Sequence, residues 1–442
     1  MNGYIQRTSR EDFQEEICLT PNSGASNPEH QPLLTKMRPA INMLQLLGLL
    51  PGVLPQSCGI GNRLVRSMKN CCLMFLTITY ILVNIGITGV AVWVCQQFQV
   101  TYGPWHPESV MSVITGLKPV QSGMNIFILL INRNAHQRLL RSMQSAEQTF
   151  RSDFRCVPNI RRLVHILLYS AAAMYAFTLG LQIVEYITGL VIKSQAAVEE
   201  EGLPSHLEWL FEYAPFVLTP FFSLWQMLPL IYFMALTSLI RFWLTHLIRA
   251  MNNDRQFQIF HMNVYFEHFL KLVTIQSDVG EVFNLFILFN LGVCVVTLCL
   301  TIYFLTQAKN LGPDDGASYV FYFNLVWSLI QIFVLFVYLI AICIAGFRTN
   351  EKSRKVLQTA LSMRPDDKHD RYQIFCLAEK LHSQYSWGIS IWRGFLIERG
   401  LLFTIVGLII TYALVLLRLK PNDNCKNLFN NKTITFGQNA TH

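Results

Sequence analysis

Two ionisable side chains could do chemistry because long apolar runs place them where charge is costly. Glu185 lies within the apolar stretch 163–192, and Arg418 lies at the end of the last such stretch, 396–418. An ionisable group inside a membrane-spanning helix is a functional-site candidate by default. Near a helix end, the same side chain can instead reach the membrane interface. Glu185 is therefore either a binding group or an interfacial carboxylate.

The sequence has no pattern that builds a catalytic or metal centre. It contains no HExxH pair, no P-loop and no nucleophile elbow. Its 11 cysteines form no CxxC pair, and five of them lie inside apolar runs, where a thiol acts as a small hydrophobe. We therefore expect no enzymatic activity, no metal and no cofactor. Cys95 and Cys425 are one plausible disulfide pair, whose proximity the sequence leaves open.

The elements that position these residues are membrane helices. Of the 442 residues, 52% are hydrophobic and only 14% are charged, and the mean hydropathy is +0.34. Soluble proteins carry about 25% charged residues, so a soluble enzyme is excluded. In a membrane protein, the net charge of +8 matters through the distribution of Lys and Arg between the loops. We therefore do not interpret it as a nucleic-acid-binding charge, and we expect no nucleic-acid partner.

Stretches long enough to cross a bilayer set the fold class. A hydrocarbon core of about 30 Å needs about 20 apolar residues in a helix. The second stretch is interrupted by Lys118, Pro119 and Gln121. A shorter run, 43–55, is broken by Pro51 and predicts an interfacial or re-entrant segment. The seven predicted spans are 71–95, 110–132, 163–192, 214–243, 282–306, 319–346 and 396–418.

The distribution of Lys and Arg predicts the orientation of this all-α membrane protein. The tail 1–70 and the segments 133–162, 241–281 and 347–395 hold 27 of the 35 basic residues, whereas the alternate segments hold six. By the positive-inside rule, the amino terminus is cytoplasmic. After the seven-helix domain over 71–418, the tail 419–442 is then extracellular. Two glycosylation patterns, at Asn431 and Asn439, lie in that tail.

Two segments between spans predict helices that extend beyond the membrane. In 244–281, apolar residues recur among polar ones at close to helical spacing, and 351–385 has a similar pattern. Such helices suit a cytoplasmic assembly domain, or else pack only within their own subunit. The apolar positions in the first segment are Phe257, Phe260, Val264, Phe269, Leu272, Val273 and Ile275.

The last stretch resembles the final helix of the insect gustatory receptors and their nematode relatives. It contains Arg399-Gly400-Leu401-Leu402-Phe403, and then Thr411-Tyr412 with five apolar residues before Arg418-Leu419. The family motif has Thr-Tyr, five apolar residues and Gln-Phe, so Arg418-Leu419 marks a divergent member. The resemblance implies a ligand-gated cation channel in the plasma membrane. It would be a homo- or hetero-tetramer of related subunits, with the seventh helix of each around one pore.

The resemblance places Thr411, Tyr412, Val415, Arg418 and Leu419 along that pore. Four guanidiniums around one axis would repel cations. Three outcomes are open: Arg418 turns toward the headgroups, the ion selectivity differs, or the protein does not conduct alone. We favour the first, because Arg418 lies at a helix end.

The family's ligand pocket opens in the outer half of the helix bundle, where aromatic and hydrogen-bonding side chains suit a small-molecule ligand. Interfacial or packing roles are the alternative for each aromatic residue. The pocket candidates are Glu185, Tyr186, Trp225, Tyr303, Tyr322, Asn324, Trp327 and Gln331.

Other function classes fit less well. A light- or peroxide-sensing member of the same family is the main alternative. A G-protein-coupled receptor has the opposite orientation, and the triad Asp370-Arg371-Tyr372 lies in a charged stretch that predicts a solvated helix face. For a transporter, no internal repeat is found, although the second span is interrupted at Lys118-Pro119.

Overall fold

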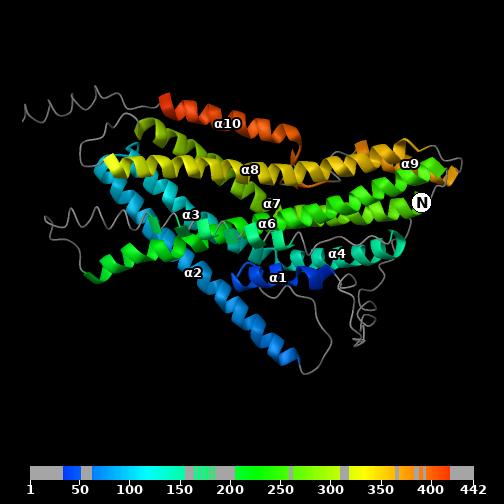
Figure 1. The fold of residues 1–442 in the computed structure, drawn as a ribbon, viewed down its shortest axis with the longest axis horizontal. Coiled ribbons are helices and arrows are strands. Elements are labelled where there is room, and N and C mark those ends of the chain that lie inside the picture. Colours follow the sequence, from blue (N-terminus) through cyan, green and yellow to red (C-terminus); the bar gives the residue numbers. More distant parts are fainter. Residues whose placement is uncertain are drawn as a thin grey trace, which may run out of the picture.

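The computed structural model describes residues 33–50, 62–154, 205–257, 262–308, 318–363, 368–382, 388–391 and 395–418, with further helical residues between 164 and 184. Nearly all of them are helical (Figure 1). The elements are α1 (Leu33–Leu46), α2 (Asn62–Tyr102), α3 (Pro107–Ile131), α4 (Arg133–Phe154), α6 (Ser205–Phe257), α7 (Met262–Ala308), α8 (Ser318–Leu361), α9 (Lys368–His382), β1 (Ser390–Ile391), β2 (Phe395–Leu396) and α10 (Arg399–Arg418).

Six helices in the described part of the chain are long and apolar enough to cross a membrane: α2, α3, α6, α7, α8 and α10. They coincide with six of the seven predicted spans, which confirms the all-α membrane fold. The remaining stretch, 163–192, contains a shorter apolar helix, Val164–Phe177. Much of that stretch, including Glu185 and Tyr186, lies outside the described residues.

The second predicted span, 110–132, is observed as one helix, α3, although Pro119 lies inside it. Helices that cross membranes tolerate proline when neighbouring groups satisfy the freed backbone. The polar residues that suggested a break bond instead to other helices. The paired broken helices that would favour a transporter therefore lose their only support in the sequence.

The segment predicted to lie at the membrane interface begins as α1 and turns into the protein core. The helix ends at Leu46, ahead of Pro51, and Gly48 follows with a φ of +72°. A Cβ at this position would lie 2.8 Å from the Tyr80 ring, so only glycine fits the turn. Leu49 and Leu50 are buried, and the Thr77 hydroxyl donates to the Gly48 carbonyl at 3.1 Å. The described part of the segment is thus packed against α2.

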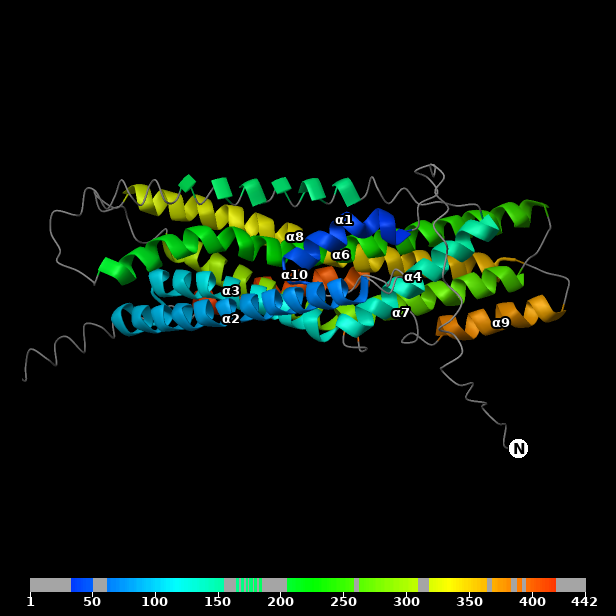
Figure 2. The same cartoon turned by 90° about the horizontal axis from the view of Figure 1, so that it is seen from below.

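Helices α6, α7 and α8 continue well beyond the predicted spans (Figure 2). The first half of α7 packs antiparallel to α4, through contacts that run from Arg138–Glu281 at 3.1 Å to Asp153–His268 at 2.7 Å. In the predicted amphipathic pattern, Phe269, Leu272, Val273 and Ile275 are buried. Val264 is 38% exposed, which corrects the prediction at that position, and Phe257 and Phe260 lie outside the described side chains.

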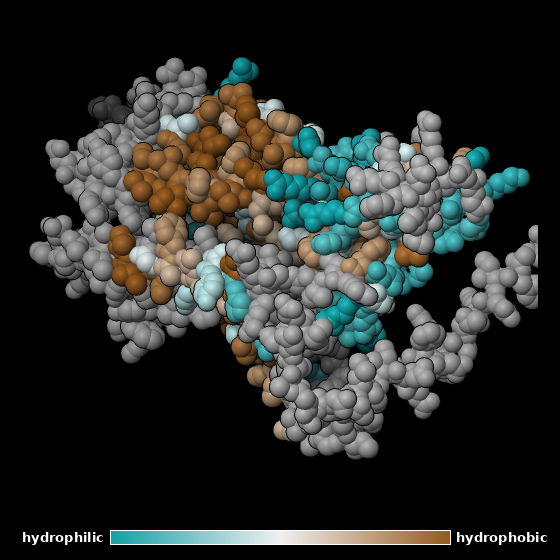
Figure 3. Space-filling view, turned by 45° about the vertical axis from the view of Figure 1, so that its right-hand side comes forward, coloured by the Kyte–Doolittle hydropathy of each residue, from teal (hydrophilic) through white to brown (hydrophobic). Residues whose placement is uncertain are grey.

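The surface of the molecule is apolar around the membrane-spanning helices and hydrophilic around their extensions. In Figure 3 apolar residues gather over one end of the molecule and hydrophilic residues over the other. The triad Asp370-Arg371-Tyr372 lies on α9, where Arg371 and Tyr372 are exposed. The predicted solvated helix face is therefore observed. Helix α7 is central, since it contacts α3, α4, α6, α8, α9, α10 and β1.

Candidate functional site

A buried polar network joins four of the membrane helices. At its centre, the Asn290 carboxamide of α7 exchanges hydrogen bonds with Asn125 of α3: Nδ2 donates to Asn125 Oδ1 at 2.7 Å. Gln121 Nε2 donates to Asn290 Oδ1 at 2.6 Å, and the Tyr338 hydroxyl of α8 donates to the same oxygen at 3.1 Å. Gln226 of α6 donates to Gln121 Oε1 at 2.8 Å. Each of the four helices thus contributes a side chain that bonds to a side chain of another helix.

The network is expected to fix the relative positions of these helices. Gln121, Asn125, Asn290 and Tyr338 are all buried, so each bond forms where water does not compete. Sequence analysis did not identify the network. A signal was available, because Gln121 and Asn125 are four residues apart and therefore share a helix face inside an apolar span.

Two predicted pocket residues serve other contacts. Trp225 is buried, and its Nε1 donates to the Leu47 carbonyl at 3.1 Å. Tyr303 is buried in a separate cluster with Val110, and its hydroxyl donates to the Trp105 carbonyl at 3.1 Å. These bonds connect α6 to the end of α1 and α7 to the α2–α3 turn. The structure does not bring the two rings together.

Two other predicted pocket residues lie one turn apart on α8. The ammonium of Lys118 is 5.0 Å from the ring centre of Trp327, which is within the range of a cation–π contact. Gln331 has a buried Oε1 without a hydrogen-bond partner among the described residues. The side chains of Tyr322 and Asn324 lie outside the described ones. Trp327 and Gln331 are thus the two predicted pocket residues that lie together, and Lys118, which was not among the candidates, lies against Trp327.

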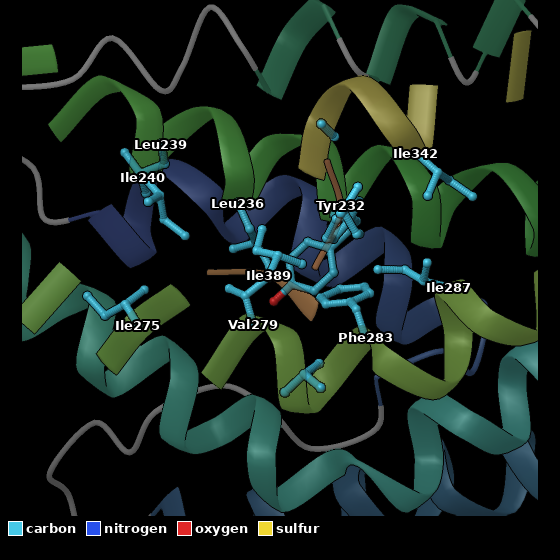
Figure 4. Close-up of a cluster of buried hydrophobic side chains, with 14 of the residues drawn as sticks. Tyr232, Leu236, Leu239, Ile240, Ile275, Val279, Phe283, Ile287, Ile342 and Ile389 are labelled. Atoms are coloured by element: carbon cyan, nitrogen blue, oxygen red, sulfur yellow. The ribbon is translucent and has the colours of Figure 1, made fainter. Parts of the chain in front are cut away.

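A second buried polar side chain, His136, lies near the start of α4 among aromatic rings. Its ring lies 5.8 Å from the Tyr232 ring and 5.6 Å from the Phe283 ring, between centroids. Figure 4 shows Tyr232 and Phe283 among aliphatic side chains that include Leu236 and Val279. Neither ring nitrogen of His136 has a hydrogen-bond partner in the described part of the protein. Burial lowers the pKa of His136 from 6.5 to about 3 because the charged ring would be desolvated.

The His136 shift predicts an acid-dependent loss of stability. Between pH 6.5 and pH 3 the unfolded chain binds a proton that the folded protein excludes, so stability falls as the pH falls through this window. From pH 7 to pH 5 we expect the free energy of unfolding to drop by about 2 kcal/mol more in the wild type than in His136→Phe. Detergent-induced unfolding at the two pH values measures the difference. An equal drop in the free energy of unfolding of both proteins between the two pH values would contradict the assignment of a neutral, buried His136.

Helix α10 is held by a narrow apolar ridge. Its buried residues are Ile405, Ile409 and Ala413, which pack toward α7 and α8. On its opposite side are all of its Gly and Thr residues and its last Arg, and each is exposed. At about 100° per residue, these positions lie within about 40° of the Thr411 direction. We call them the polar stripe: Gly400, Thr404, Gly407, Thr411 and Arg418.

The predicted pore residues relate differently to the polar stripe. Thr411 and Arg418 belong to it, and Val415, an exposed apolar residue about 40° from Thr411, lies at its edge. Tyr412 is 54% exposed but points about 100° away from Thr411. Leu419 lies outside the described residues, as do Asn431, Asn439 and Cys425, and Cys95 is a free thiol.

The described residues contain no cluster of three or more His, Cys, Asp or Glu that could hold a metal.

Comparison with known proteins matches nearly the whole of this architecture. Residues 37–420 match the family described as 7tm chemosensory receptor. A relative from Caenorhabditis elegans, named "Probable G-protein coupled receptor egl-47", is 28% identical over 409 residues, which are 87% of this chain and 74% of the relative. The solved structure of the insect olfactory receptor OR5 from Machilis hrabei superposes with a TM-score of 0.61 at 15% identity, and the match covers 88% of this chain and 99% of that one. At that identity, the likeness to OR5 concerns the fold.

Proposed function

Because the chain belongs to the 7tm chemosensory receptor family, we propose that it is a ligand-gated ion channel in which α10 lines the permeation path. The family assignment makes the protein a multi-pass membrane chemosensory receptor; the conduction, its cation selectivity and the tetramer are the proposal. The amino terminus is cytoplasmic in this proposal, which puts the extensions of α6, α7 and α8 in the cytoplasm.

The polar stripe is the observation that carries the proposal. A helix face that meets lipid tails is expected to be apolar, whereas Gly and Thr faces occur where helices meet one another or water. The stripe faces away from the described part of the subunit, because it lies opposite the buried ridge of Ile405, Ile409 and Ala413. One side face of the helix carries Phe403 and Ile410, which suit lipid. Copies arranged around an axis would turn their stripes toward one path.

Cysteine accessibility tests whether the stripe lines that path. We expect a charged methanethiosulfonate reagent to block the current of Thr411→Cys and to leave Ile410→Cys unaffected. Ile410 is the matched control because it is the adjacent residue and is also exposed, but lies to the side of the stripe. The wild type measures the background from native cysteines. Block of Ile410→Cys with no effect on Thr411→Cys would reject this orientation of α10.

Arg418 is the residue on which the proposed cation selectivity depends. It is the last residue of α10 and is exposed, so its long side chain can turn toward the headgroups. We therefore expect Arg418→Gln to leave the reversal potential in an ion gradient unchanged. A shift toward the cation equilibrium potential would instead put the guanidinium in the permeation path.

Whole-cell recording of the chain expressed alone, with ion substitution, tests conduction and stimulus together. The stimuli are a panel of sugars and bitter compounds, then peroxide and short-wavelength light, which covers the light- or peroxide-sensing alternative. We expect an evoked cation current. The name of the nematode relative raises coupling to a G protein as the second candidate; a second-messenger response with no current from the surface-expressed chain would favour it.

A further inference from the structure

One buried carboxamide connects α7, α8 and the antiparallel β1–β2 pair, which precedes α10 and which we call the hairpin. Asn350 Nδ2 donates to the carbonyls of Ile389 at 3.0 Å and Ile397 at 3.1 Å. Its Oδ1 accepts from the Ile389 amide at 2.7 Å and from Gln276 Nε2 of α7 at 3.3 Å. An Asn side chain has two N–H donors and an oxygen with two lone pairs. All four of these capacities are used, so no other residue type can reproduce the set.

The described surroundings of this carboxamide are buried and hydrogen-bonded. Asn350, Gln276 and Ser353 are buried, and the Ser353 hydroxyl donates to Gln276 Oε1 at 2.7 Å. Since water is excluded, a lost bond at this position leaves a backbone group unsatisfied. Gly388, which precedes Ile389, has a φ of +100°, and a Cβ there would lie 3.0 Å from Asn350 Oδ1. Glycine at position 388 thus allows the hairpin backbone to lie against Asn350. We call this set, Gln276, Asn350, Ser353, Ile389 and Ile397, the hairpin junction.

The hairpin junction is adjacent to the start of α10. Only Glu398 separates Ile397 from Arg399, the first residue of the helix. In the hairpin itself, the Ile397 amide donates to the Ile389 carbonyl at 3.1 Å. Beyond this point, α10 is held within its subunit by the narrow ridge described above. The inner end of α10 therefore follows directly on backbone that is fixed by hydrogen bonds. The rest of the helix is held mainly by apolar side chains, namely the buried ridge with the partly buried Leu401, Leu402 and Leu416.

We propose that Asn350 is a positioning residue for gating, which fixes the inner end of α10 to α7 and α8 and so sets the balance between the closed and open positions of the helix. The gating part rests on the proposed function of α10. The positioning part requires only that the hairpin and α10 move together.

Asn350→Asp tests the role with little change in volume. The aspartate keeps acceptors for the Ile389 amide and Gln276, but it places oxygen against the two carbonyls that Nδ2 now serves. In purified full-length protein, we expect hydrogen exchange across 388–401 to become at least tenfold faster, with α3 and α7 unchanged. In a Thr411→Cys background without any ligand, we expect the rate of labelling by a charged biotin–methanethiosulfonate to change at least fivefold.

Glu351→Gln is the matched control. It alters the neighbouring residue and removes the exposed ion pair with Arg399 at 2.7 Å, yet we expect both rates to stay within twofold of the wild type. Gln276→Met keeps every bond between Asn350 and the hairpin, and we expect an intermediate effect. This variant also decides the matter if Asn350→Asp does not reach the membrane.

The two measurements separate the possible failures. Unchanged exchange across 388–401 in Asn350→Asp and Gln276→Met would overturn the positioning role. Faster exchange with unchanged labelling at Thr411→Cys would overturn the gating role. A wild type that conducts no current would reject the proposed function and the gating role with it, while the exchange rates would still decide whether Asn350 positions α10.

Discussion

Asn290→Leu is expected to lower the free energy of unfolding by about 2–4 kcal/mol, a large effect for one substitution. Leucine has a similar volume, so the loss comes from polar partners rather than from a cavity. Gln121 Nε2 and the Tyr338 hydroxyl lose their acceptor at Asn290, and Asn125 Oδ1 loses its donor. Unsatisfied groups in a buried site cost about 1–3 kcal/mol each, although partners that rearrange within the membrane reduce the total.

Thr301→Val is the control for Asn290→Leu. Thr301 is also buried on α7, but its hydroxyl donates only to the Thr297 carbonyl of the same helix, at 2.7 Å. We expect its loss to cost less than about 1 kcal/mol. Unfolding by sodium dodecyl sulfate in mixed micelles, followed by circular dichroism, compares the two. Equal losses would show that the network contributes no more than an ordinary hydroxyl and would remove its proposed role in positioning four helices.

The membrane spans could be predicted because the signal is local. Length and hydropathy within one stretch define a span, and six of the predicted stretches are apolar helices. The same local rule gives no reason for a polar Gln121 inside the second span. The partner that makes Gln121 acceptable in the membrane is Asn290, 169 residues away in the sequence. Hydropathy along a chain carries no information about contacts between residues so far apart in the sequence.

The candidate site was less predictable for the same reason. Trp225 and Tyr303 have the residue types of a ligand pocket, but their polar atoms bond to backbone carbonyls of distant turns. Asn350 lies in a polar stretch where an asparagine attracts no notice, and its four hydrogen bonds come from three parts of the chain. The polar stripe, in contrast, follows from the period of one helix. A helical wheel of 399–418 would have revealed it.

Gly346→Val is expected to destabilise the protein by about 2–4 kcal/mol, because α8 and the hairpin approach too closely at this point for any side chain. A Cβ at Gly346 would lie 2.7 Å from Ile397 Cγ2 and 2.8 Å from its Cδ1. Ile397 is fully buried and follows directly on β2, so its side chain cannot turn into solvent. The hairpin must move away from α8, which would break the bonds that Asn350 makes to it.

Gly292→Val separates this clash from the general cost of a branched residue in a membrane helix. Gly292 lies in α7, and a Cβ there would meet nothing within 4 Å, so we expect a loss below about 1 kcal/mol. A double-mutant cycle gives the sharper evidence. Ile397→Ala should relieve much of the loss caused by Gly346→Ala, because it removes Cγ2 and Cδ1, the two Ile397 atoms nearest the new methyl group, and leaves only Cβ. Additive effects in the detergent unfolding assay would contradict a direct contact between the two positions, and with it the close approach of the hairpin to α8 that brings Asn350 within reach of Ile389 and Ile397.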